Sequence, residues 1–192
     1  MIKAIRNTLL NAVPDSISVP VRFAYHKLFG RPEPEQRLLN ALVRPGTTVA
    51  DIGANNGTYV YALAPIAHHG HAFEPIPRCA ELLRAYGANN VTIPEVALSD
   101  MEGFANLSCP TSRGETILSR AHLSPAAEKS ASVPVGENTI RVRSTKLDGF
   151  GFTNISFLKL DVEEHELSVL KGQWRLFCDA NRICSSRLSN DT

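Results

Sequence analysis

The sequence lacks the features that identify several classes of protein. It has no apolar run long enough to cross a bilayer, because residues 2–13, the longest candidate, are interrupted by Lys3, Arg6 and two asparagines. No uninterrupted apolar stretch follows these basic residues, so a signal peptide is not expected. The 4 cysteines form no C-x-x-C pair, which excludes a disulfide framework in a chain of this length and favours a reducing, cytoplasmic compartment.

A strong charge of either sign is also missing. The net charge of +1 produces no field that would attract a polyanion, and we expect no nucleic-acid partner. The charge is uneven, since residues 1–45 carry seven Lys and Arg against three Asp and Glu, a net of +4. This basic leader fits a helical cover of the domain, which we favour, or a peripheral contact with an anionic membrane surface.

The composition is that of one globular domain. With 192 residues, 43% hydrophobic and 20% charged, the chain has enough apolar side chains for a core and too few residues for two ordinary domains. We divide it into a helical leader over residues 1–44, a domain over 45–177, and a polar tail over 178–192. The tail has no periodic apolar face and is expected to be disordered.

Hydrophobic spacing predicts an α/β fold. In the leader it predicts helices over residues 2–13, from Pro20 to Gly30, and over 34–43. Beyond residue 46, short apolar runs alternate with helical patterns, which is typical of a parallel sheet doubly wound by helices. Pro94 directly follows the third strand and indicates that this strand is not central. Residues 104–143 have a looser pattern and are expected to form an insertion or lid. The four strands are predicted at 47–52, 72–74, 91–93 and 155–160.

The strongest local signal lies where the first strand meets its helix. Residues 50–57 read Ala-Asp-Ile-Gly-Ala-Asn-Asn-Gly, and glycines at Gly53 and Gly57 allow a ligand to approach the backbone, with Asn55 between them. A dinucleotide site would have a glycine where this turn has Asp51. Since a carboxylate attracts an ammonium group and repels phosphate, the turn favours S-adenosylmethionine (SAM) over NAD.

Two further segments follow later strands of the sheet. Glu74 ends the second strand, where doubly wound folds place an acid on the ribose hydroxyls of a nucleoside. Ser99 and Asp100 follow the third strand and fit either contacts to an adenine amino group or a plain turn. Together with the glycine turn, Glu74 predicts a nucleoside site at this edge of the sheet.

Ionisable residues also follow the fourth strand. Asp161 and Glu163 are the candidates for orienting and deprotonating an acceptor hydroxyl, because methyl transfer to an alcohol requires removal of its proton. Glu164 and Glu166 fit equally well as acids that stabilise the start of the next helix. Lys159 lies inside the apolar strand and either reaches a carboxylate across the crevice or extends its ammonium group to solvent.

Seven stretches between residues 47 and 172 carry a family resemblance: residues 49–57 (VADIGANNG), 72–75 (AFEP), 96–100 (VALSD), 145–148 (TKLD), 158–163 (LKLDVE), 165–167 (HEL) and 169–172 (VLKG). In these stretches the chain resembles the FkbM family of SAM-dependent methyltransferases. The resemblance implies a class I, Rossmann-like methyltransferase sheet, SAM as cofactor, and a small-molecule or glycan hydroxyl as methyl acceptor. It implies that Asp51, Gly53, Gly57 and Glu74 bind the cofactor and that Asp161 and Glu163 lie at the acceptor site.

The chain departs from the family in two places. Glu164 stands where the family usually has glycine, and after residue 172 no further strand is predicted, so strands 5 to 7 of the family's sheet are expected to be missing. The fourth strand would then be an uncovered apolar edge. These departures leave two alternatives open: a truncated, non-catalytic remnant of such an enzyme, or, less well supported, an NAD-dependent oxidoreductase.

A metal site is not predicted. The run His-His-Gly-His at residues 68–71 falls at the end of the helix predicted from about residue 57 to 64, where histidines complement the dipole and glycine makes the turn.

Overall fold

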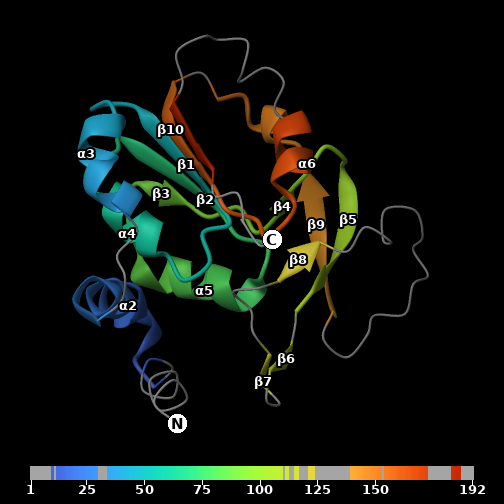
Figure 1. The fold of residues 1–192 in the computed structure, drawn as a ribbon, viewed down its shortest axis with the longest axis horizontal. Helices are drawn as coiled ribbons and strands as arrows, with labels where there is room; N and C mark the ends of the chain where they lie inside the picture. Colours follow the sequence, from blue (N-terminus) through green and yellow to red (C-terminus); the bar gives the residue numbers. More distant parts are fainter. Residues whose placement is uncertain are drawn as a thin grey trace.

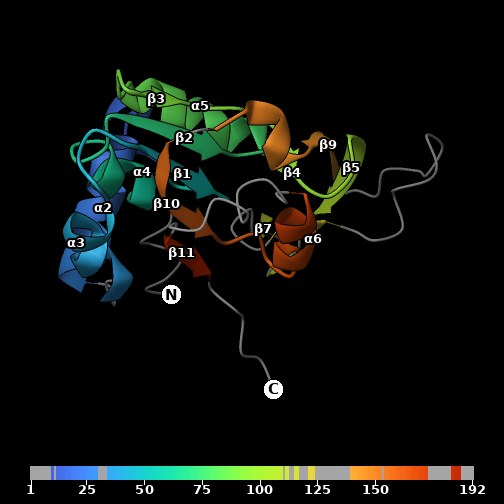
Figure 2. The same ribbon diagram turned by 90° about the horizontal axis from the view of Figure 1, so that it is seen from above.

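The computed structural model describes residues 10, 12–29, 34–109, 111–112, 115–116, 121–123, 139–152, 154–172 and 183–186. A five-stranded parallel sheet forms its centre, in the order β11-β10-β1-β2-β3 (Figures 1 and 2). Strand order therefore reverses between β1 and β10, as in doubly wound sheets. The predicted α/β fold with a parallel sheet is confirmed, and β3 lies at the edge that Pro94 indicated. The strands are β1 (Thr48–Ile52), β2 (His69–Phe73), β3 (Val91–Thr92), β10 (Ile155–Leu160) and β11 (Ile183–Ser186).

Successive side chains of β1 and β10 point to opposite faces of the sheet, so these strands contribute to two separate hydrophobic cores, one on each face. On one face, Val49 and Phe157 pack with Tyr59 and Leu63 of α4. On the other face, Ile52 and Leu160 belong to a cluster with Leu147 and Val169. Every residue of β10 is buried, which is typical of a central strand in a parallel sheet. The helical elements are α2 (Asp15–Phe29), η1 (Pro34–Leu38), α3 (Leu39–Leu42), α4 (Thr58–Leu63), α5 (Pro77–Tyr86), η4 (Leu147–Phe150) and α6 (Glu166–Lys171).

The predicted insertion contributes a second, mixed sheet beside the first, with the order β4-β9-β5-β8 (Figure 1). The alternation predicted for residues 139–143 is part of β9. The inner face of this sheet, with Leu107 and Val142, packs against Ile76 and Cys79 at the start of α5. Where the structure describes it, the insertion is therefore an ordered sheet that packs against the start of α5. Its strands are β4 (Ala97–Leu98), β5 (Gly103–Ser108), β8 (His122–Leu123) and β9 (Thr139–Thr145), and a separate pair is formed by β6 (Thr111–Ser112) and β7 (Glu115–Thr116).

One expectation about the polar tail is wrong. Residues 183–186 form β11, which pairs in parallel with β10, so β10 is flanked on both sides and is not an exposed edge. The backbone groups of a buried central strand require a partner on each side, whereas a four-residue segment is too short to show a hydrophobic period. The rest of the tail, including Cys178, lies outside the described residues.

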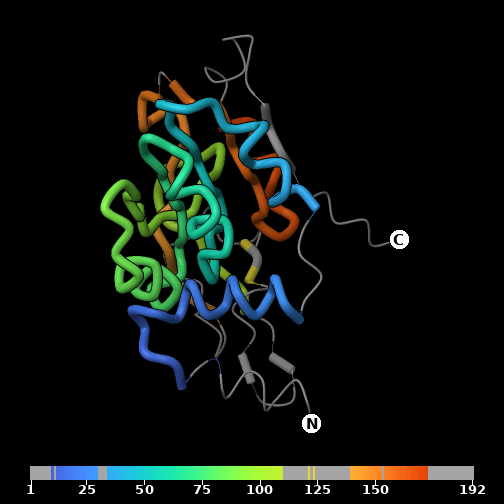
Figure 3. Tube along the Cα trace, turned by 90° about the vertical axis from the view of Figure 1, so that its left-hand side faces the viewer, coloured from blue at the N-terminus to red at the C-terminus, as the bar shows by residue number. Residues whose placement is uncertain are grey.

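The leader also differs from its prediction. The helix expected to begin after Pro20 begins at Asp15 and contains Pro20; the helix expected over 34–43 is split into η1 and α3. Figure 3 shows α2, in blue, running beside α4 and α5. Val19 of α2 is fully buried against Gly57, and this packing outweighs the hydrogen bond that proline removes. The first predicted helix lies almost wholly outside the described residues.

Among the described residues, no helix combines the length and apolarity needed to cross a bilayer.

The end of α6 can approach the segment after β4 closely because Gly172 has no side chain. A Cβ atom there would collide with the backbone carbonyl of Ser99, although the backbone of Gly172 has an ordinary φ of −77°. The same glycine accepts a hydrogen bond from the amide of Asp148 at 3.3 Å. This residue therefore brings together the segments that follow β4, β9 and α6.

We expect Gly172→Ala to lower the free energy of unfolding by about 2–3 kcal/mol, because two backbone segments would have to separate. Gly149→Ala is the matched control, since a Cβ at Gly149 meets nothing within 4 Å; it should be neutral or stabilise by up to about 1 kcal/mol. Urea unfolding of both variants checks this. Equal effects of the two substitutions would contradict it.

Candidate functional site

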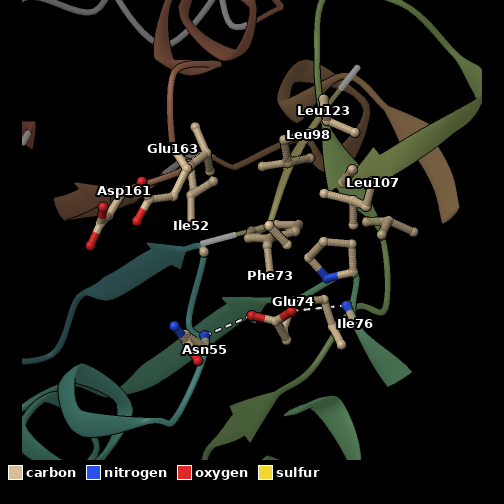
Figure 4. Close-up of a pocket in the computed structure, with 16 residues that line it drawn as sticks. Ile52, Asn55, Phe73, Glu74, Ile76, Leu98, Leu107, Leu123, Asp161 and Glu163 are labelled. Atoms are coloured by element: carbon tan, nitrogen blue, oxygen red, sulfur yellow. Dashed lines mark hydrogen bonds between the residues drawn. The ribbon is translucent and has the colours of Figure 1, made fainter. Parts of the chain in front are cut away.

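A cleft opens at the carboxyl ends of β1, β2 and β10, at the point where the strand order reverses (Figure 4). The space between its lining residues, open solvent included, is about 660 Å³. Polar groups line its sheet side, and apolar side chains of the second sheet line the opposite side. The lining residues are Ile52, Gly53, Asn55, Phe73, Glu74, Pro75, Ile76, Val96, Ala97, Leu98, Leu107, Ala121, Leu123, Asp161, Val162 and Glu163.

The turn after β1 forms one rim of the cleft. Gly53 has a φ of 78° and Asn55 a φ of 46°, a left-handed conformation that glycine and asparagine adopt most readily. A Cβ at Gly53 would collide with the backbone carbonyl of Asp161, so this glycine allows the chains leaving β1 and β10 to touch. Gly57 does not line the cleft; a Cβ there would lie 2.6 Å from Leu83, which makes it a packing residue.

Glu74 is the most constrained carboxylate in the cleft. Its side chain is only 3% exposed, and its two oxygens accept hydrogen bonds from the backbone amides of Asn55 (2.6 Å) and Ile76 (2.8 Å) (Figure 4). Burial raises the pKa of Glu74 to about 7, although these two amides and Lys159 act in the opposite direction. The carboxylate is thus held in one orientation at the end of β2.

Asp51 lies behind the lining. It is 2% exposed, and its Oδ1 is 3.1 Å from Nζ of Lys159, its register partner on β10. The same Nζ donates a hydrogen bond to the carbonyl of Gly53 at 2.9 Å and lies 3.6 Å from Oδ2 of Asp161. Lys159 therefore reaches across to carboxylates, which was one of the two alternatives for this residue. Lys159 is not among the predicted site residues, although a lysine within an apolar strand already indicates that its ammonium group needs a polar partner.

Asp161 and Glu163 lie together on the β10 side of the cleft (Figure 4). Asp161 is fixed by its backbone, whose amide donates to the carbonyl of Ile52 at 3.0 Å. The next turn contains two successive left-handed residues, Glu163 (φ 44°) and Glu164 (φ 69°). Non-glycine residues in this conformation are uncommon and concentrate at functional sites. Glu166 lies in the first turn of α6 and accepts a hydrogen bond from the amide of Val162, which precedes the helix, at 3.3 Å.

Ser99 and Asp100 follow β4 but do not line the cleft. The hydroxyl of Ser99 donates to Asp100 Oδ1 at 3.1 Å and lies 3.1 Å from Nε2 of His165. These contacts tie the segment after β4 to the start of α6. Of the nine site residues predicted from the sequence, the cleft brings together Gly53, Asn55, Glu74, Asp161 and Glu163.

The apolar wall was not predicted. Leu98, Leu107 and Leu123 face the carboxylates across the cleft (Figure 4), and they come from β4, β5 and β8 of the second sheet. Ala105 and Leu107 lie on the same side of β5, and this alternation in the sequence indicates that the strand has an apolar face. It does not indicate which part of the molecule that face covers.

The sequence predicted that the histidine run ends a helix, but residues 69–71 are the first part of β2, and they do not line the cleft. His69 and His71 both contact the hydroxyl of Thr92, at 3.2 and 2.8 Å. Burial, with a smaller contribution from His69, lowers the pKa of His71 to about 4. The part of the chain that the structure describes contains no cluster of three or more side chains suited to holding a metal ion.

Comparisons with known proteins agree with this architecture. A family model described as the methyltransferase FkbM domain matches residues 51–186. The chain is similar in fold to the crystal structure of a methyltransferase FkbM from Methylobacillus flagellatus KT, with a TM-score of 0.51 and 15% sequence identity. The similarity covers 94% of this chain and 46% of that one, so the chain spans about half the length of this neighbour. No curated protein matches the sequence.

The turn after β10 gives a prediction about stability. Glycine adopts the conformation of Glu164 without the steric penalty that a Cβ incurs, so we expect Glu164→Gly to raise the free energy of unfolding by about 0.5–1 kcal/mol. Glu164→Ala removes the same charge and keeps the Cβ, and it should give no comparable gain. Chemical unfolding distinguishes the two, and an equal gain in both would show that charge, not conformation, is responsible.

Glu74 gives a prediction about pH. Its folded pKa of about 7 lies above the ordinary value of 4.5, so its contribution to stability is complete below pH 4.5 and is lost as the pH rises through 7, by roughly 3 kcal/mol in total. We expect this slope in the difference between wild type and Glu74→Gln when unfolding is measured from pH 5 to 8. Glu81→Gln, a change at an exposed carboxylate, should run parallel to wild type. A Glu74→Gln curve that also runs parallel would contradict the prediction.

Proposed function

Because the chain belongs to the methyltransferase FkbM family, we propose that it binds SAM and transfers a methyl group to a hydroxyl of a small molecule or sugar. The observation that carries the proposal is Glu74, a buried carboxylate held by two backbone amides at the carboxyl end of β2. A carboxylate oxygen has capacity for more than one hydrogen bond, so Glu74 can still accept from ribose hydroxyls.

The chemistry of the cleft fits a nucleoside with a cationic tail. Its apolar side chains, such as Ile76, Leu98 and Leu107, suit a planar base next to the ribose. In the proposal, Ser99 and Asp100 lie near the adenine edge, since they directly follow Leu98. The described lining carries carboxylates and no Lys or Arg, which favours a sulfonium and an ammonium group over the pyrophosphate of NAD.

The methionine part would lie along the turn after β1. Gly53 and Asn55 present backbone there, and Gly57 supports the turn by packing behind it. Asp51 would act from behind the lining, where it pairs with Lys159 and so helps to hold the turn.

When bound, SAM supplies a methyl group attached to a positively charged sulfur. The chain's own residues would orient the acceptor and remove its proton. Asp161 or Glu163, on the β10 side of the cleft, would accept the hydroxyl proton as general base. Such assistance is worth ~10²–10⁴-fold in rate, and positioning of the two reactants contributes the remainder.

Isothermal titration calorimetry with SAM, its demethylated product and NAD tests the proposal. We expect SAM binding by the wild type and an affinity about 10–100-fold lower in Glu74→Gln, because a hydrogen bond to a charged group contributes about 1.5–3 kcal/mol. Glu81→Gln is the control and should bind as wild type does.

Transfer of a labelled methyl group from SAM to a panel of sugars and hydroxylated small molecules then tests catalysis. SAM binding without transfer to any alcohol would support the non-catalytic alternative. NAD binding without SAM binding would overturn the proposal.

A further inference from the structure

We propose that Lys159 is a positioning residue for this site: its buried ammonium group holds the turn after β1 and the carboxylate of Asp161 in place on the two sides of the strand-order reversal. The inference rests on the proposed function, because its consequence is the geometry in which the cleft receives SAM.

The contacts of Lys159 span both chain segments. Its Nζ carries three hydrogens, and three oxygens surround it: the Gly53 carbonyl at 2.9 Å, Asp51 Oδ1 at 3.1 Å and Asp161 Oδ2 at 3.6 Å. The ring of Tyr59 lies 5.1 Å from Nζ, within the range of a cation–π contact. The ammonium group is therefore enclosed from several directions, and the side chain is only 10% exposed.

These contacts reach the cleft without Lys159 lining it. Gly53 and Asp161 line the cleft, whereas Lys159 and Asp51 do not. Displacement of the ammonium group would therefore affect a ligand through the rim formed by Gly53 and through the orientation of the Asp161 carboxylate. This makes Lys159 a residue that acts through others and not a catalytic residue.

Burial explains why a lysine performs this role. Asp51, at 2% exposed, is a charge that the interior tolerates only when it is compensated. Lys159 compensates it directly across the β1–β10 ladder, where the two residues are register partners. The contact with Asp51 alone would suffice for an ion pair that only stabilises the fold. Lys159 also contacts Gly53 and Asp161, and these two contacts connect the ion pair to the cleft.

The test separates the structural ion pair from the positioning role. Asp51→Asn/Lys159→Met removes both buried charges, and Asp51→Asn alone is its reference, so whatever Asp51 contributes cancels in the comparison. Two quantities are measured: the dissociation constant of SAM and the rate of amide hydrogen exchange over residues 53–56. Asp51→Asn/Lys171→Met, which changes an exposed lysine of α6, is the matched control.

We expect the double variant to bind SAM at least 10-fold more weakly than Asp51→Asn and to exchange residues 53–56 faster, with the control equal to Asp51→Asn in both. Equal affinity and equal exchange in Asp51→Asn/Lys159→Met and Asp51→Asn would overturn the proposal. If the double variant does not fold, Asp51→Asn/Lys159→Gln replaces it and the same two outcomes decide.

Failure of the proposed function is recognised separately. It appears as a wild-type chain that does not bind SAM, before any variant is compared. Hydrogen exchange needs no SAM, so it still decides whether Lys159 holds the turn after β1.

Discussion

The close approach of the chains leaving β1 and β10 is the constraint on which the site depends. At Gly53 the two backbones touch, because no Cβ separates this residue from the carbonyl of Asp161. The parallel strands bring their carboxyl ends to one edge, and the reversal of strand order opens the crevice there. The side chains that follow, Asn55 on one segment and Asp161 and Glu163 on the other, are thereby placed around one cleft.

Charge reinforces this arrangement. Four carboxylates lie in or directly behind the lining, namely Asp51, Glu74, Asp161 and Glu163, and Lys159 is the cation that the described structure places among them. Each buried acid is compensated differently: Asp51 by Lys159, and Glu74 by two backbone amides. Burial keeps the pKa of Glu74 raised, although the two amides act in the opposite direction. The other three carboxylates outnumber the single ammonium group of Lys159, and this excess of negative charge suits a cationic ligand.

The sequence predicted the site best where a few adjacent residues determine both the local backbone turn and its chemical groups. The turn at residues 50–57, the acid at Glu74 and the carboxylates after β10 are each specified by a few adjacent residues. Lys159 shows an intermediate case, because its place in an apolar strand signalled a contact without identifying the partner. Pairing over long distances was harder: β11 has too few residues to show a period, and the wall formed by Leu107 and Leu123 depends on how two sheets pack. At Pro20 a local rule fails, because the tertiary packing of the buried Val19 keeps α2 helical through the proline.

The two sides of the cleft come from different parts of the fold. The polar side belongs to the central sheet, where Gly53 and Lys159 leave little freedom for change. Of the apolar side, Leu107 and Leu123 belong to β5 and β8 of the second sheet, and their side chains join neither the backbone contact at Gly53 nor the Lys159 cluster. Substitutions at Leu107 and Leu123 can therefore change which molecules the cleft accepts, while the carboxylates on the opposite side keep their positions.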